Sequence, residues 1–180
     1  MGLTGRNASG KTTIVEWFAA KGLRSASCSD SIRSWLAEQD IAESRDALIE
    51  GGRELRRRGG SGILAEMLLE MLDGDSAVID SIRTPGEVEA LRAREEFVLI
   101  EVRAGIEARW ARAQDRARTG DPLDKATFIA QVGSEVKAKD EAGQALDATA
   151  ALADMMLIND GNIDGLHADL EDLWNILSEN

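Results

Sequence analysis

The chain has 180 residues, which suits a single domain, and its hydrophobic fraction of 43% is ample for a buried core. A net charge of −12 argues against a general nucleic-acid-binding protein, and no apolar run is long enough to cross a bilayer. The single cysteine, Cys28, excludes an internal disulfide bond. We therefore expect a cytoplasmic protein with neither a nucleic-acid nor a membrane partner, and the sequence leaves its oligomeric state open.

The first predicted unit is a strand at residues 1–4, a glycine-rich loop and a helix at residues 11–21. Residues 5–12 read Gly-Arg-Asn-Ala-Ser-Gly-Lys-Thr, which fits the phosphate-binding pattern G-x-x-x-x-G-K-[ST]. In such a loop the backbone amides face the phosphates, Lys11 reaches the β- and γ-phosphates, and Thr12 offers its hydroxyl to Mg²⁺. A glycine turn before a surface helix is the alternative interpretation. The expected nucleotide-binding residues are Gly5, Asn7, Ser9, Gly10, Lys11, Thr12 and Thr13.

The next stretch is mostly helical. A short polar strand is predicted at residues 24–29, and Ser29 or Asp30 is the expected N-cap of the helix that follows. A second helix is predicted at residues 45–58, ending at Gly59 and Gly60. Ser61 is expected to cap a third helix, rich in Leu and Met, that runs to about residue 72.

The remainder of the chain alternates strands and helices. Strands are predicted at residues 77–80, 97–102 and 155–159. Helices are predicted from Thr84 and Pro85 to about residue 96, and at about 105–117, 124–139, 145–152 and 163–177. This alternation predicts one α/β domain spanning residues 1–180, with five strands in a parallel sheet and right-handed crossovers.

The positive charges are unevenly distributed, because every Lys and Arg lies at or before Lys139. Arg109, Arg112 and Arg116 are spaced i, i+3 and i+7, so they share one helix face, and Arg118 follows shortly after. An acidic protein that gathers arginine in this way is suited to an anionic ligand. A solvated face paired with nearby carboxylates is the alternative interpretation.

Several further residues have the chemistry of a phosphoryl-transfer site. Asp80 ends a predicted buried strand, where a carboxylate suits Mg²⁺, although a helix cap or turn residue would look the same. Asp30 could orient an acceptor hydroxyl, or it could simply cap its helix. The arginines expected to bind the acceptor or the transferring phosphate are Arg33, Arg53 and Arg83, and solvated arginines are their alternative.

The order of these motifs resembles the P-loop nucleoside and nucleotide kinases, in particular the dephospho-CoA-kinase-like and deoxynucleotide-monophosphate-kinase-like groups. The resemblance covers nearly the whole chain. It includes the glycine loop, Ser-Asp-Ser-Ile-Arg at 29–33, Val-Ile-Asp-Ser-Ile-Arg at 78–83, Arg-Thr-Gly-Asp-Pro at 118–122 and Asn-Asp-Gly at 159–161. Among these segments, the glycine loop is highly specific for nucleotide phosphates. The others are weak signals alone and become informative because they occur in this order along the chain.

The resemblance implies a three-layer P-loop NTPase fold with a five-stranded sheet of order 2-3-1-4-5. It implies that residues of about 30–72 form the acceptor side and that residues of about 105–139 form a helical lid over the donor phosphates. By analogy with that lid, Arg112 and Arg116 are the expected catalytic arginines, beside Lys11 and Asp30. The resemblance also places Asn159 and Gly161 near the donor adenine.

These expectations amount to an ATP- and Mg²⁺-dependent phosphotransferase acting on a small nucleotide-type acceptor, with a (deoxy)nucleoside monophosphate favoured. Two alternatives stay open at this point. The first is transfer to a hydroxyl, as in dephospho-CoA kinases, because Asp30 could serve such an acceptor. The second is a regulatory protein that binds ATP without catalysis, because the same glycine loop would serve it equally well.

Overall fold

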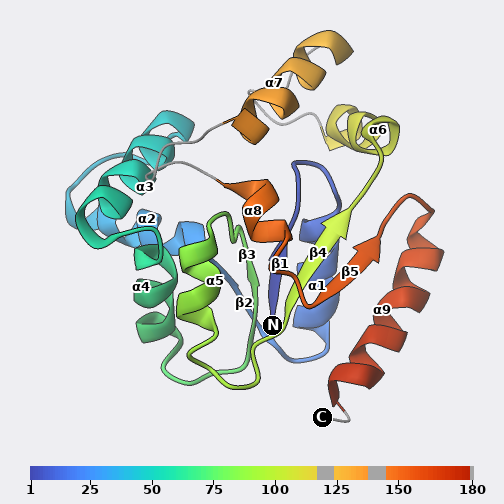
Figure 1. Ribbon diagram of the computed structural model, residues 1–180, viewed down its shortest axis with the longest axis horizontal. Helices are drawn as coiled ribbons and strands as arrows, with labels where there is room; N and C mark the ends of the chain where they lie inside the picture. Colours follow the sequence, from blue (N-terminus) through green and yellow to red (C-terminus); the bar gives the residue numbers. More distant parts are fainter. Residues whose placement is uncertain (117–123, 138–144, 179–180) are drawn as a thin grey trace.

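The computed structural model describes residues 1–116, 124–137 and 145–178 and has a parallel five-stranded sheet at its centre (Figure 1). Its strands are β1 (Gly2–Thr4), β2 (Arg24–Ser27), β3 (Ala77–Asp80), β4 (Leu99–Arg103) and β5 (Met155–Ile158). They lie in the order β2-β3-β1-β4-β5, which confirms the predicted α/β fold and strand order. Because β1 is central, the loop that follows it emerges in the middle of the sheet's carboxyl edge.

Nine helices are described, and their positions agree closely with the sequence pattern. They are α1 (Lys11–Ala20), α2 (Cys28–Glu38), α3 (Arg45–Gly59), α4 (Ile63–Leu72), α5 (Pro85–Leu91), α6 (Ile106–Arg116), α7 (Lys125–Lys137), α8 (Leu146–Ala150) and α9 (Ile163–Ser178). No helix within the described ranges is both long and apolar enough to cross a membrane.

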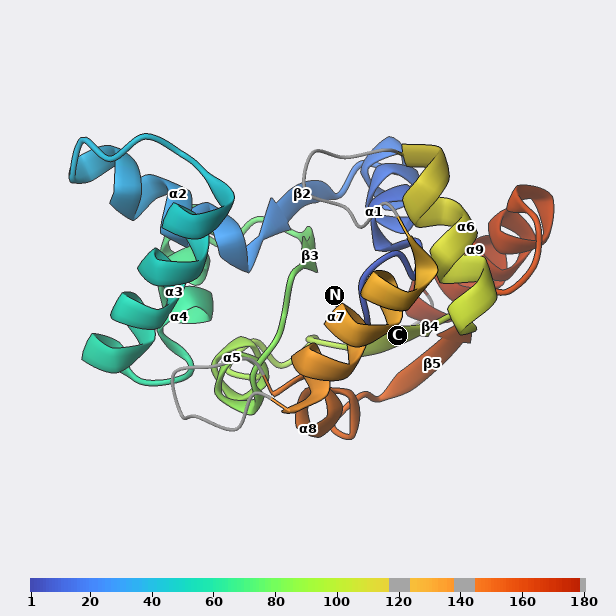
Figure 2. The same cartoon turned by 90° about the horizontal axis from the view of Figure 1, so that it is seen from above.

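The sheet separates two apolar cores, because alternate strand residues face opposite sides. One core joins Leu3, Val78 and Ile100 to α1 and α9, and the other joins Ile79 and Leu99 to α2, α3, α4 and α5. A third, smaller cluster packs α6 against α7 through Ala113, Phe128 and Val132. Figure 1 shows α6 and α7 beyond the arrowhead of β4, and Figure 2 shows the same two helices from above. The expected lid segment therefore lies at the edge of the sheet where the glycine loop emerges.

The start of α2 differs from the sequence prediction. The strand ends at Ser27, and Ser27 rather than Ser29 or Asp30 is the N-cap, with its side chain accepting a hydrogen bond from the Ser29 amide. Asp30 occupies the third helical position and accepts from the Ser27 amide at 2.8 Å, which completes a capping box. The polar residues after β2 therefore begin the helix instead of extending the strand.

Three other element boundaries also differ from the sequence prediction. Ser61 does not cap α4, because Gly62 takes the N-cap position and the Ser61 carbonyl instead accepts from the Thr84 hydroxyl. Helix α5 begins at the expected capping box of Thr84 and Glu87 but ends at Leu91, short of residue 96. Strand β4 begins at Leu99, two residues later than predicted, because Phe97 belongs to the turn after α5.

Candidate nucleotide-binding site

The glycine loop runs from the end of β1 to the first turn of α1, the arrangement expected of a phosphate-binding loop. Gly5 and Gly10 have φ angles of 134° and 100°, which side chains rarely adopt. A Cβ atom at Gly5 would lie 2.3 Å from the Val102 carbonyl oxygen, and one at Gly10 would lie 2.2 Å from the Asn159 Nδ2 atom. Both positions therefore require glycine for conformation and for space.

The loop encloses the side chain of Lys11. Its Nζ atom donates to the Gly5 carbonyl at 2.7 Å and to the Arg6 carbonyl at 3.2 Å, so the charge is held across the loop. No side chain caps the N-terminus of α1, where Gly10 occupies the N-cap position. The N-cap residue thus supplies no side-chain acceptor to the first turn of α1, and a helix N-terminus of this kind favours an anion.

Asn159, at the end of β5, connects the loop to the rest of the site. It is buried, and its Nδ2 atom donates to the Ser9 carbonyl at 2.9 Å. Arg112 of α6 reaches the same point, because its Nη2 atom donates to the Asn159 carbonyl at 2.8 Å and to the Asn159 side-chain oxygen at 3.1 Å. Gly161 lies in the exposed turn beyond Asn159, and contact of either residue with an adenine stays a prediction.

The arginines of α6 separate into different roles. Arg116 donates to the Asn7 side-chain oxygen at 3.1 Å, so this second expected lid arginine also reaches the glycine loop. Arg109 is buried instead, where it donates to the Ala104 carbonyl at 3.1 Å and stacks over Phe128. Arg109 therefore joins α6 to the rest of the lid, while Arg118 lies outside the described residues.

Asp80 and Thr12 carry the two side-chain oxygens that the sequence predicts as magnesium ligands. Asp80 ends β3 half-buried, and its Oδ1 atom accepts from the Ser81 amide at 2.6 Å. Thr12 is exposed in the first turn of α1. No group of three or more His, Cys, Asp or Glu side chains suited to a metal occurs within the described ranges. A magnesium ion that arrives with a nucleotide needs only one or two protein oxygens, so this pair fits it.

On the acceptor side, three of the four residues predicted from sequence are engaged with neighbouring charges. Arg33 donates to Asp30 at 2.9 Å and to Glu43 at 3.1 Å. With the Ser27 amide on its other oxygen, each oxygen of the Asp30 carboxylate accepts one hydrogen bond. Arg53 is half-exposed on α3 and pairs with Glu50 at 2.9 Å. Their contact with an acceptor stays a prediction.

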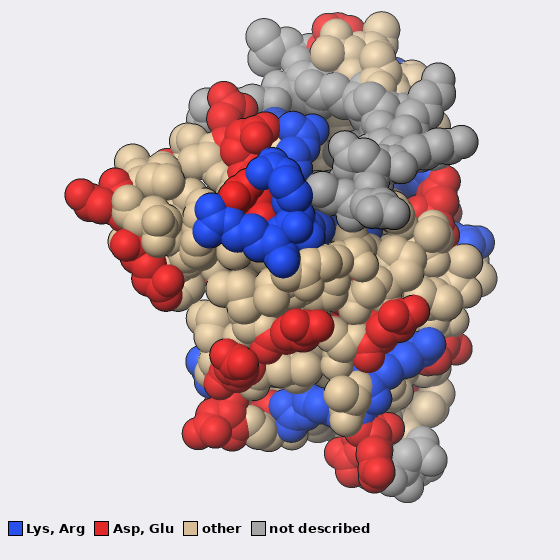
Figure 3. All heavy atoms as spheres, turned by 60° about the vertical axis from the view of Figure 1, so that its left-hand side comes forward, with Lys and Arg blue, Asp and Glu red and all other residues tan. Residues whose placement is uncertain are grey.

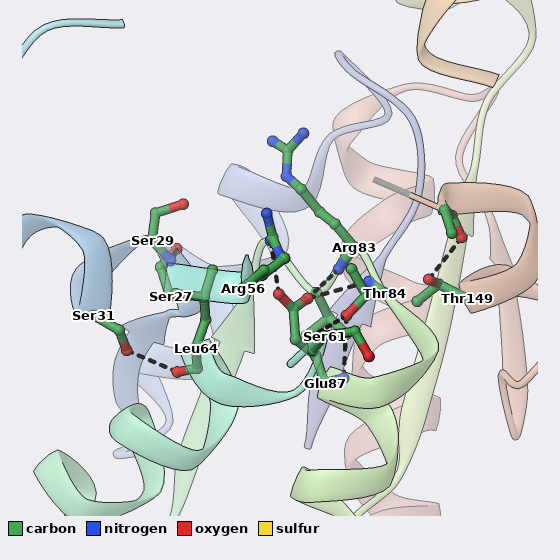
Figure 4. A network of polar contacts seen from close by, with 12 residues as sticks. Ser27, Ser29, Ser31, Arg56, Ser61, Leu64, Arg83, Thr84, Glu87 and Thr149 are labelled. Carbon is green, nitrogen blue, oxygen red and sulfur yellow. Dashed lines mark hydrogen bonds and ion pairs between the residues drawn. The ribbon is translucent and has the colours of Figure 1, made fainter. Parts of the chain in front are cut away.

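A buried ion pair on this side was not predicted. Arg56 of α3 donates from Nη2 to Glu87 Oε1 at 2.8 Å, and the two side chains are only 6% and 0% exposed. The other Glu87 oxygen accepts from the backbone amides of Arg83 and Thr84 at 2.7 and 3.2 Å (Figure 4). The only sequence signal was the capping pattern of Thr84 and Glu87, because nothing local distinguishes Arg56 from the arginines beside it.

Two glycines within α3 help to position Arg56. Gly51 and Gly52 lie within α3, where a Cβ atom would come 2.9 Å and 3.1 Å from atoms of the Ile32 side chain, so they allow α3 to approach α2 closely. Figure 4 shows the Arg56 and Arg83 side chains directed to the same side of the Glu87 carboxylate. The Nε atom of Arg56 is buried without a hydrogen-bond partner among the described residues.

Neighbouring arginines of α3 lie in solvent. Arg57 and Arg58 are each about two-thirds exposed, and both pair with Glu54. The hydrogen bond from Arg58 is the main reason why the pKa of the Glu54 carboxyl lies below its ordinary value. Figure 3 shows Lys and Arg side chains gathered on this side of the molecule, next to Asp and Glu. The arginine-rich end of α3 thus gives the face a mixed rather than a purely positive surface.

The glycine loop, the helix that it begins and the strand order together define the P-loop kinase fold. Solved structures support this assignment of fold. The chain resembles shikimate kinase from Bacteroides thetaiotaomicron with a TM-score of 0.59 and 14% identity, covering 98% of this chain and 97% of that one. It also resembles TT1252 from Thermus thermophilus, with a TM-score of 0.57, 19% identity and coverage of 99% and 95%. These likenesses do not single out the dephospho-CoA or deoxynucleotide kinase groups.

The chain belongs to the UPF0200 family. A UPF0200 protein of Pyrobaculum aerophilum is 31% identical over 134 residues, which cover 72% of each chain. A relative from Pyrococcus abyssi with the same family name is 27% identical over 177 residues, covering 94% of this chain and 91% of the relative. No protein-family profile matches the chain.

Proposed function

We propose that this protein is an ATP- and Mg²⁺-dependent phosphotransferase that acts on a small nucleotide-type acceptor, with a (deoxy)nucleoside monophosphate favoured. The observation that supports it most directly is the convergence on one loop of Lys11, the uncapped N-terminus of α1, and two arginines of α6. Phosphoryl transfer requires mainly alignment and neutralisation of charge, and these groups supply both on the donor side.

On the donor, the loop amides and Lys11 would hold the β- and γ-phosphates, and Arg112 and Arg116 would exchange their present carbonyl and amide partners for phosphate oxygens. A phosphate accepts charge-assisted hydrogen bonds, which are stronger than those to Asn7 or to backbone carbonyls. Thr12 and Asp80 would hold Mg²⁺, whose charge would offset that of the phosphates. Asn159 and Gly161 are proposed to lie beside the adenine.

On the acceptor, the arrangement of Asp30 favours a phosphate nucleophile over a hydroxyl. Both of its oxygens already accept hydrogen bonds, from Arg33 and from the Ser27 amide. These bonds tie Asp30 into the capping box and the pair with Arg33, which is a structural role, and a monophosphate is already an anion that requires no base. We propose that Arg33, Arg53 and Arg83 bind the phosphate of that acceptor, while Asp30 positions Arg33.

The test is ADP release by the purified protein with Mg-ATP and a panel of nucleoside monophosphates, nucleosides and dephospho-CoA. We expect turnover with at least one monophosphate, and a loss of at least about a hundredfold in Lys11→Ala, because that change removes the charge from the loop. Lys21→Ala is the matched control, since Lys21 lies at the opposite end of α1 and pairs with Glu171.

The same panel separates the two alternatives. Turnover only with a hydroxyl acceptor would replace the nucleotide acceptor by dephospho-CoA-like chemistry. Tight binding of Mg-ATP without transfer to any acceptor would support the regulatory ATP-binding protein instead. Saturating Mg-ATP at about a hundred times its Kd should stabilise the fold by about 2.7 kcal/mol, and Lys11→Ala should lose that shift if the loop is the binding site.

A further inference from the structure

Strand β5 is an open edge of the sheet. It pairs in parallel with β4, from Ile100 with Met155 to Arg103 with Ile158, and no described strand lies on its other side. An edge strand presents unpaired backbone groups that can add a further strand. Figure 1 shows β5 at the right of the sheet, with α9 beside it. The outer side of β5 therefore has no strand partner among the described residues.

The two edges of the sheet are built differently. The opposite edge, β2, reads Arg-Ser-Ala-Ser, and Arg24 is ion-paired with Asp75. Strand β5 reads Met-Met-Leu-Ile, with Met156 and Ile158 exposed by 53% and 59%. Proteins commonly protect edges with charged or polar residues, as β2 does, and β5 lacks that protection. The exposed apolar residues of β5 make this edge a candidate docking surface.

A groove of about 320 Å³ runs between β5 and α9 and supplies a surface for a partner at this edge. All four β5 residues line it, together with Leu173 and Ile176 of α9. Two carboxylates, Asp169 and Asp172, also line the groove. The groove suits alternate long cationic side chains of an extended segment along the strand, with their aliphatic stems against the apolar lining and their charged ends at the two carboxylates.

Charge indicates the kind of segment. Asp169 and Asp172 have no ion-pair partner in the described part of the chain, whereas Glu171 beside them is paired with Lys21. From residue 140 onward the sequence contains no Lys or Arg. The nearest described cation on β4, Arg103, is already paired with Glu101. A second copy of this chain related by a twofold axis would bring like carboxylates together, which is unfavourable.

We infer that β5 and the groove beside it bind an extended polypeptide segment in which apolar residues alternate with Lys or Arg. The segment adds a sixth strand to the sheet. Its backbone pairs with the outer side of β5, and its Lys or Arg side chains enter the groove to meet Asp169 and Asp172. Its alternate, apolar side chains point to the other face of the sheet, beside the exposed Met156 and Ile158. This surface lies on the opposite edge of the sheet from the acceptor-side helices, and the inference does not rest on the proposed phosphotransferase activity.

The experiment measures binding of a fluorescent peptide of about eight residues with alternating valine and lysine, the usual length of a strand or slightly more. The comparison probe has glutamate in place of lysine. We expect saturable binding of the lysine peptide, at least about tenfold tighter than the glutamate peptide and weakened by salt. Amides of β5 should gain protection from hydrogen exchange when the lysine peptide binds.

Two variants locate the site. Ile158→Lys places a charge on the edge and should weaken binding of the lysine peptide by at least about tenfold, as should Asp169→Asn combined with Asp172→Asn. Ser25→Lys makes the same kind of change at the exposed opposite edge and should leave binding unchanged. Equal binding of both peptides, no binding, or full affinity in Ile158→Lys would overturn the inference. A dimer that is seen in sedimentation and that Ile158→Lys dissociates would also overturn the inference, because the occupant of this edge would then be a second copy of the chain.

Discussion

Asn159 illustrates how one side chain can maintain a binding loop. Its amide donates to the Ser9 carbonyl, and its two oxygens accept from Arg112. The same amide fills the space in which a Cβ atom of Gly10 would lie. The glycine in the motif is therefore required partly by a residue about 150 positions away, which no local pattern in the sequence could reveal.

Asn159→Ala should therefore weaken ATP binding as well as stability. It removes the buried side-chain donor to the Ser9 carbonyl and one of the two acceptors that residue 159 offers Arg112, and losing such buried hydrogen bonds costs about 1–3 kcal/mol. We expect Mg-ATP affinity, measured by calorimetry, to fall about tenfold or more because the loop loses its support. Asn175→Ala, on the exposed face of α9, is the matched control and should retain both properties. Unchanged ATP affinity in Asn159→Ala would remove this residue from the proposed site.

Cys28 gives a prediction about pH. Burial first, and then the nearby Glu87 carboxylate, raise the pKa of this thiol well above its ordinary value of 9.0. The folded protein keeps the proton at a pH where the unfolded chain releases it, so this stabilisation is complete below pH 9.0 and is lost as pH rises toward the folded pKa. The free energy of unfolding should fall with pH above that value, by at most about 1.4 kcal/mol per pH unit from this group.

The measurement is urea denaturation at a series of pH values for the natural protein and for Cys28→Ala. The variant is expected to be less stable throughout, because it leaves a cavity, but to lose less stability as pH increases above 9.0. Parallel curves for the two proteins in that range would show that another group is responsible.

At the scale of elements, Glu87 links three parts of the acceptor side. Its carboxylate caps the first turn of α5, pairs with Arg56 of α3, and holds the amide of Arg83. Glu87→Gln should destabilise the fold by about 3–5 kcal/mol, because it leaves the Arg56 charge buried without its counterion. Denaturant titration measures this loss. Glu89→Gln, on the exposed side of α5, should have little effect.

A double variant distinguishes the charge from the packing. Arg56→Met combined with Glu87→Gln removes both charges and should recover part of the stability lost in Glu87→Gln alone. If the double variant were as unstable as the sum of the single variants, the ion pair would not be the cause of the loss.

Elements whose pattern is local were predictable from the sequence. The glycine loop, the capping box of Thr84 and the apolar strand β3 all depend on neighbours in the chain, and the structure has each of them. The Gly-Gly pair at 51–52 lies inside α3 without ending it, because the contact with Ile32 of α2 compensates for poor helix propensity. Ser27 was overlooked as a cap because it also ends a strand.

At the scale of the whole molecule, the strand order could be predicted only from the resemblance to known kinases. The alternation of strands and helices predicts a parallel sheet, but it does not predict the order of the strands within that sheet. The site was predictable where it follows the motif, as for Lys11 and Gly10. It was not predictable where it depends on distant pairs, such as Arg56 with Glu87 or Arg112 with Asn159. Such pairs are determined by tertiary packing, which places residues 31 or 47 positions apart in contact.

The capping of α5 by Glu87 also constrains how the molecule could move. Because one carboxylate joins α3, α5 and the segment after β3, a displacement of α3 toward the glycine loop would carry Arg83 with it. Bending at the two ends of α3 alone, near Ser44 and at Gly60 with its φ angle of 87°, would instead separate Arg56 from Glu87. A closing movement that preserves the buried ion pair must therefore carry α3, α5 and the segment before α5 together as one rigid body.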